Sequence, residues 1–158
     1  MLTPPIEQLF VVYFKPVKHD LYSFLVANYL RLIGEYEEDT HVGLLIFYAD
    51  GTSALIQSDS NGVYKLEAVD GLLPYRTWYQ EVPYYSSEWI HNALVHFSLL
   101  RGSFPLLNYI IYPFAKTKPL VCTGFIEHLL MLTVTNCTPK KLRKRVKGMY
   151  DHIESTVS

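Results

Sequence analysis

Cysteine is scarce in this sequence, with only Cys122 and Cys137 among 158 residues. Two cysteines do not make the disulfide framework of a small secreted domain, and neither has the spacing of a metal ligand. Apolar runs are broken by Pro, Tyr or charged residues, so none reaches the roughly 20 residues that a membrane span needs. The start "MLTPPIEQLF" lacks the basic residues and apolar core of a signal peptide. We therefore expect a soluble protein without a membrane span, cytoplasmic when synthesised.

An excess of either charge is also missing, because 14 Lys and Arg stand against 15 Asp and Glu, for a net charge of −1. This balance excludes a general attraction to nucleic acid. The one basic run, "KKLRKRVKG" from Lys140 to Gly148, is interpreted as a solvated helix face. Phosphate-binding loops, zinc-ligand spacing and paired-carboxylate motifs are absent as well. The sequence therefore predicts no cofactor and no metal, and it favours no nucleic-acid partner.

What the sequence does contain is typical of one folded domain. Hydrophobic residues make up 49% and charged residues 18%, which excludes a disordered chain. A length of 158 residues suits a single domain with a core of its own. Aromatic residues reach 15%, including 13 tyrosines, and tyrosine is amphipathic. This tyrosine content indicates a pocket, an interface or a hydrated edge of the core, without choosing among them.

The first half of the chain reads as a strand, a helix and a sheet. A short apolar run predicts a strand over 9–14, and "HDLYSFLVANYLRLIG" predicts a helix that Asp20 caps and Gly34 ends, with Leu21, Phe24, Leu25 and Leu32 at helical spacing. The segment 41–48 is apolar on both faces and predicts a central strand. Asp50-Gly51 predicts a hairpin to a return strand over 53–58. A half-exposed edge strand at 63–69 and a fourth strand at 76–84 follow.

The second half changes to helical spacing. "SSEWIHNALVHFSLLRG" predicts a helix with a serine N-cap that ends at Gly102. Three prolines predict short helical or irregular pieces over 103–119. A further helix over 120–132 begins at or just before Cys122, and the last one, over 139–153, has Thr138 as its N-cap and Pro139 at its first position. Strands that are followed by helices predict an α+β fold.

Two residues suggest a nucleophilic site. The N-terminus of a helix favours a thiolate, and Cys122 stands where a helix is expected to begin. Backbone amides at Thr123 and Gly124 are suited to stabilise an oxyanion. His41, at the edge of the central strand, is a suitable base. Each residue taken alone favours a structural role, since free cysteines are commonly core residues and a lone histidine is more often structural.

The combination resembles a known family. "HVGLLIFYADGTSALIQSDSNGV" precedes "CTGFIEHLLML", with Cys122 standing 81 positions after His41. This order is similar to the circularly permuted branch of the papain-like NlpC/P60 superfamily, which includes small phage-encoded members. The match covers about 41–142 and includes the hairpin, a "GV" turn, Trp78 and a "TP" helix start, so the single domain 1–158 would add to this core a strand and helix over 9–34 and a basic helix over 139–153.

The resemblance implies a permuted papain-like fold and a thiol hydrolase. In such an enzyme Cys122 would attack the carbonyl of an amide bond, in peptidoglycan or another peptide, and His41 would transfer the proton. An acyltransferase would use the same two residues. A third, orienting polar group normally lies on the strand after the histidine. This sequence has no histidine on that strand, although many relatives have one.

The length of the hairpin loop decides which side chain orients His41. A two-residue loop would put Ser58 and Ser60 on the face of His41, whereas a three-residue loop would put Gln57 and Asp59 there. Asp59 or Gln57 would hold an imidazole better than a serine. Both alternatives stay open from the sequence alone.

The remaining histidines and the second cysteine are interpreted as structural or surface residues; they are His19, His91, His96, His128 and Cys137. A second function is also compatible with the sequence. The missing histidine and the many tyrosines favour a catalytically inactive papain-like structural or interaction protein, for instance a virion or tail component of a phage. The expected partners are a peptide or peptidoglycan-like substrate in the first case and other virion proteins in the second.

Overall fold

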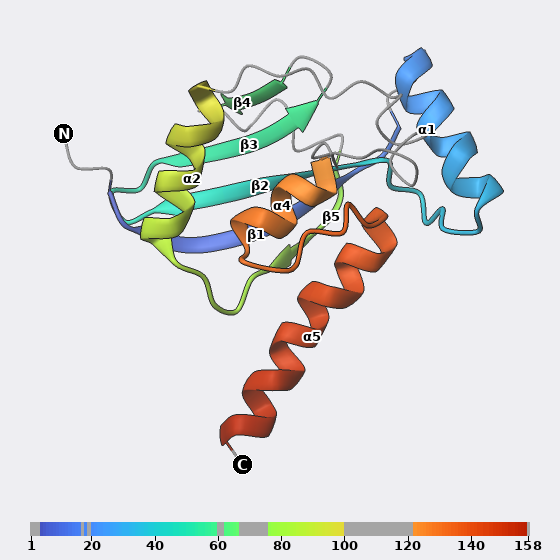
Figure 1. Cartoon of the computed structure of the whole chain (residues 1–158). Helices are drawn as coiled ribbons and strands as arrows, with labels where there is room; N and C mark the ends of the chain where they lie inside the picture. The colour runs from blue at the N-terminus through green and yellow to red at the C-terminus, as the bar shows by residue number, and fades with distance from the viewer. Residues whose placement is uncertain are drawn as a thin grey trace.

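The computed structural model describes residues 4–16, 18, 20–59, 62–66, 76–99 and 122–157. These residues form an antiparallel sheet and helices, which confirms the α+β class (Figure 1). The pieces expected over 103–119 lie outside the described residues. The described elements are β1 (Ile6–Phe14), α1 (Leu21–Leu32), β2 (His41–Tyr48), β3 (Ser53–Asp59), β4 (Gly62–Leu66), β5 (Arg76–Glu81), α2 (Ser87–Leu99), α4 (Cys122–Leu129) and α5 (Pro139–Val157).

The described residues form a sheet of five strands in the order β4-β3-β2-β1-β5, and every described pair is antiparallel. β2 is central and β4 is an edge strand, as the sequence predicts. β5 pairs with β1 at the opposite edge instead of continuing the meander from β4. Hairpin signals predict only which consecutive strands pair, so the partner of β5 had no local signature in the sequence.

The two faces of the sheet carry separate apolar clusters, because side chains alternate along each strand. The larger cluster lies on the face that α2 and α4 cover in Figure 1. Its strand residues include Val11, Tyr13, Val42, Leu44, Ile46 and Ile56, which join Ile90 of α2, Phe125 and Ile126 of α4 and Leu142 of α5 in one buried core. The opposite face carries the smaller cluster of Val12, Phe14, Leu45 and Leu55.

The hairpin between β2 and β3 has a three-residue loop. Phe47 pairs with Ser53, and the backbone N–H of Tyr48 donates to the carbonyl of Thr52 at 2.9 Å. Gly51 has a φ of 84°, a left-handed conformation that suits glycine at the end of such a loop. The register therefore selects the alternative in which Gln57, and not Ser58, shares the face of His41.

The helix ends follow the predicted caps. The Ser23 N–H donates to the Asp20 carboxylate at 2.8 Å at the start of α1, and the Lys141 N–H donates to Thr138 Oγ1 at 3.3 Å at the start of α5. The orientation of α1 differs from what its spacing suggests, however. The four apolar residues that predicted the helix are exposed, whereas Val26, Ala27 and Leu30 are its buried residues.

The interpretation of the basic run on α5 as a solvated helix face is wrong for several of its side chains. Three of its side chains pair with the acidic segment 35–39 between α1 and β2. This segment and α5 therefore neutralise each other's charge. The pairs are Lys140–Glu37 at 3.3 Å, Lys141–Glu35 at 3.5 Å, and Arg143 with Asp39.

Candidate functional site

His41 and Gln57 lie together at one end of the central strands. His41 begins β2, and its Nε2 lies 2.9 Å from Oε1 of Gln57 on β3. Gln57 is paired in register with Gly43, where a Cβ atom would come within 3.1 Å of the Gln57 Cγ. The absence of a side chain at Gly43 therefore gives Gln57 room beside His41. The Phe14 ring, 5.7 Å from the imidazole between centroids, lines the same face.

The contact with Gln57 is compatible with one neutral tautomer of His41. Oε1 of Gln57 only accepts hydrogen bonds, so a neutral imidazole that donates to it carries its proton on Nε2 and its lone pair on Nδ1. Gln57 is almost completely buried, which holds its amide in this orientation. A residue that orients a general base makes a hydrogen bond of this kind to the imidazole.

The other candidates for the orienting residue are not at His41. Ser58 has the opposite side-chain direction to Gln57 and so points to the α4 side of the sheet, where its buried Oγ has no hydrogen-bond partner among the described residues. Ser60 lies outside the described residues. Asp59 ends β3, and its side chain is likewise outside the part that the structure describes.

Cys122 is the first residue of α4, as the sequence predicts, but it does not share a face with His41. It is 5% exposed and belongs to the core that Phe125 and Ile126 form against the α4 side of the sheet. His41 points to the opposite side, with Phe14 and Gln57. The structure therefore brings His41 and Gln57 together and separates both from Cys122 by the sheet itself.

The "CTG" segment has a packing role at the start of α4. A Cβ atom on Gly124 would lie 1.6 Å from Oδ1 of Asn136, so only glycine allows the close approach of this residue. Thr123 is fully buried, and no group in the described part of the chain hydrogen-bonds its Oγ1. The short residues of this segment therefore let the connection between α4 and α5 pack directly on the helix.

Glu127 of α4 is a fully buried carboxylate that the sequence analysis missed. It accepts hydrogen bonds from the Thr135 N–H at 2.8 Å, the Thr135 hydroxyl at 2.7 Å and the Asn136 N–H at 2.8 Å, and it is ion-paired with Arg145. These donors fix the loop before α5. The only signal in the sequence is a charged residue about one helical turn and a half after Cys122. Charged residues are too common in helices for this spacing to indicate a buried carboxylate.

Cys137 is in the same buried region. Burial raises the pKa of its thiol to about 12, and the neighbouring Glu127 carboxylate raises it further, against the lowering effect of Arg145. A thiol with such a pKa stays protonated at neutral pH and is a poor nucleophile. This agrees with the interpretation of Cys137 as inert.

A second polar cluster joins α5 to the sheet. The rings of Tyr13 and Trp78 stack with centroids 4.8 Å apart, and the Arg143 guanidinium carbon lies 4.2 Å from the Trp78 centroid and 4.9 Å from that of Tyr13. Arg143 is also ion-paired with Asp39, which is 2% exposed. Opposite charges at 35–39 and 140–145 were the sequence signal for this contact.

Within the described ranges, no group of His, Cys, Asp and Glu is arranged to hold a metal ion. No helix among them is long and apolar enough to cross a membrane. Comparison of the chain with protein-family models, with curated proteins and with solved structures gives no match.

Proposed function

We propose that this chain is a permuted papain-like domain that acts as a non-catalytic interaction protein, for instance a component of a phage particle. The observation that carries this proposal is the position of Cys122 and His41 on opposite faces of the sheet. A thiol nucleophile needs its base within hydrogen-bond reach, directly or through one water. Two side chains with a sheet between them do not meet this requirement.

The surface supports the same proposal. Leu21, Phe24 and Leu32 on α1 are all exposed, with exposed fractions from 60% to 85%. Large exposed apolar side chains that cluster on one element mark interaction sites on soluble domains. The papain-like fold itself is proposed on the order of the His41 strand and the Cys122 helix, and on the packing of α4 against β2 and β3.

A thiol hydrolase is the second candidate, because His41 contacts Gln57, a residue suited to orient it as a base. Gln57 would orient His41, whose Nδ1 lone pair would accept the thiol proton of Cys122. The thiolate would attack an amide carbonyl of a peptide to form a thioester, and His41 would pass the proton to the amine as the C–N bond breaks. The described conformation would have to change at the start of β2 for Nδ1 to reach the sulfur. Asp59, next to this position, stays a prediction as a further orienting residue.

Alkylation of Cys122 distinguishes the two candidates. The experiment measures iodoacetamide labelling at pH 6 by mass spectrometry, in a Cys137→Ala background, for the parent and for His41→Ala. The non-catalytic domain should label slowly and at the same rate in both proteins. His96→Ala is the matched control, because His96 is a histidine exposed on α2. Labelling at least tenfold faster in the parent than in His41→Ala, with His96→Ala unchanged, would overturn the proposal in favour of the hydrolase.

A further inference from the structure

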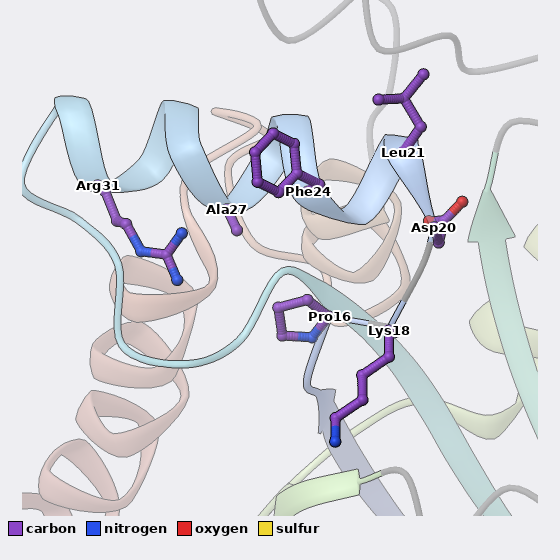
Figure 2. A pocket seen from close by; sticks show the side chains of 7 residues that line it. All are labelled: Pro16, Lys18, Asp20, Leu21, Phe24, Ala27 and Arg31. Atoms are coloured by element: carbon purple, nitrogen blue, oxygen red, sulfur yellow. The ribbon is translucent and has the colours of Figure 1, made fainter.

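A groove lies beside α1, on the part of the chain that leads from β1 into this helix. It has a volume of about 500 Å³, which is within the usual range of binding pockets. Figure 2 shows the side chains of Phe24 and Leu21 standing out from the helix, and Pro16 and Ala27 near the centre of the view. The complete lining is Pro16, Lys18, Asp20, Leu21, Phe24, Ala27 and Arg31.

The groove has two exposed cations and one engaged carboxylate. Lys18 lies toward the start of α1 and Arg31 toward its end (Figure 2). Among the described residues, Lys18 has no carboxylate partner, and Arg31 contacts only Asn28 and the Tyr36 ring. Asp20 accepts the Ser23 N–H as the N-cap of α1. Because the lining has two cations and one carboxylate, its formal charge is +1, and this excess of positive charge favours an anionic partner.

The apolar part of the groove continues along the helix. Leu21 is 71% exposed and Phe24 is 60% exposed, and both line the groove. Leu25 and Leu32 extend the same stripe at helical spacing. A helix of 12 residues is about 18 Å long, so the stripe is longer than a small ligand. An extended or helical peptide segment suits a surface of this length.

We propose that this α1 groove binds a segment of a partner protein in which apolar side chains are flanked by Asp or Glu. The apolar side chains would cover Leu21 and Phe24, and the carboxylates would pair with Lys18 and Arg31. The inference rests on the proposed interaction function and names the chemistry of the partner. A second copy of this chain and an acyl-chain ligand are the other occupants that the test must separate.

The test uses a synthetic helical peptide of 16 residues with a Leu and Phe stripe between terminal Glu residues. Its control has Lys in place of each Glu. Fluorescence anisotropy of the labelled peptides at about 0.05 M salt should show at least tenfold tighter binding of the Glu peptide to the full chain. The double variant Lys18→Glu and Arg31→Glu should reverse this preference, and Phe24→Ala should weaken both peptides at least fivefold. Tyr84→Ala, at an aromatic residue that is 48% exposed and is not part of the groove lining, should leave the affinity for both peptides unchanged.

Three results would overturn the inference. These are equal affinity for the two peptides, no binding of either, or an affinity that Phe24→Ala leaves unchanged. Sedimentation that shows a dimer broken by Phe24→Ala would assign the groove to a second copy instead, and tighter binding of decanoate than of the Glu peptide would assign it to an acyl chain. The outcome is independent of the alkylation experiment, because a reactive Cys122 would overturn the non-catalytic function without affecting peptide binding.

Discussion

Glu127 shows at the level of one residue how this domain tolerates a buried charge. Its carboxylate has no exposed surface, yet it accepts three hydrogen bonds from Thr135 and Asn136 and pairs with Arg145. A buried carboxylate is tolerated only when such donors replace its lost water. Its role is therefore to hold the connection that leads into α5, and its neighbours depend on its charge.

Glu127→Gln should destabilise the fold. The amide NH2 would replace one of the two carboxylate oxygens, so it would meet either the N–H groups of Thr135 and Asn136 or the Arg145 guanidinium, and Arg145 would lose its counter-ion. We expect a loss of about 3 kcal/mol in the free energy of unfolding, measured by urea denaturation. The control is Glu38→Gln, which removes an exposed ion pair with Lys15 and should cost less than about 0.5 kcal/mol. Equal effects of the two substitutions would contradict the role assigned to Glu127.

Sequence reasoning at the scale of single residues succeeded where strand parity decided the answer. The alternative with Gln57 beside His41 follows from the length of one hairpin loop, which is a local property. The position of Cys122 relative to His41, in contrast, is not a local property. It depends on which face of the sheet α4 covers, and apolar residues on both faces of β2 leave that choice open.

Gly124 shows at the level of an element why α4 is closely packed. A glycine in the body of a helix normally lowers stability by about 1 kcal/mol relative to alanine. Here a Cβ atom would overlap Oδ1 of Asn136, which belongs to the connection to α5. The glycine therefore stabilises the contact between two segments at the expense of the intrinsic helix propensity of α4.

Gly124→Ala should reverse the usual sign of a glycine-to-alanine change. We expect a loss of about 2 kcal/mol by urea denaturation, because the Asn136 side chain must leave its packed position. Asn136→Gly in the same chain should recover at least about 1 kcal/mol of that loss, since it removes the overlapping side chain and glycine accepts the Asn136 φ of 49°. Gly148→Ala on α5, with open space around the new Cβ, should be neutral or stabilising. A neutral Gly124→Ala would contradict the packing argument.

The elements themselves were more predictable than their contacts. Asp20, Thr138 and Pro139 act on neighbouring backbone groups, so the starts of α1 and α5 could be predicted from the local sequence. Which side of α1 is buried depends on the elements around it, and the apolar spacing of Leu21 and Phe24 did not reveal it. The pairing of α5 with the acidic segment is also non-local, because about 100 residues separate Arg143 from Asp39.

At the scale of the whole molecule, two buried groups that bind protons make stability sensitive to alkali. Burial raises the pKa of Tyr13 far above its ordinary value of 10.0, and the Cys137 pKa is raised to about 12 from 9.0. Tyr13 packs against Trp78 and against Arg143 of α5. Cys137 lies beside Glu127, which is paired with Arg145 of α5. Each of the two groups is therefore next to a contact that holds α5 in place. Both groups are neutral in the folded chain at pH 7.

The unfolded chain should therefore release these protons at lower pH than the folded chain does. Below about pH 8 both states hold them, and the free energy of unfolding is insensitive to these groups. As pH rises above 9, it should fall by up to about 1.4 kcal/mol per pH unit for each group that has ionised only in the unfolded state. The urea midpoint should be flat from pH 6 to 8 and decline between pH 9 and 11. Cys137→Ala and Tyr13→Phe should each flatten that decline, whereas the exposed Tyr84→Phe should leave it unchanged. A midpoint that stays constant to pH 11, or the same decline in all four proteins, would show that neither buried group is linked to folding.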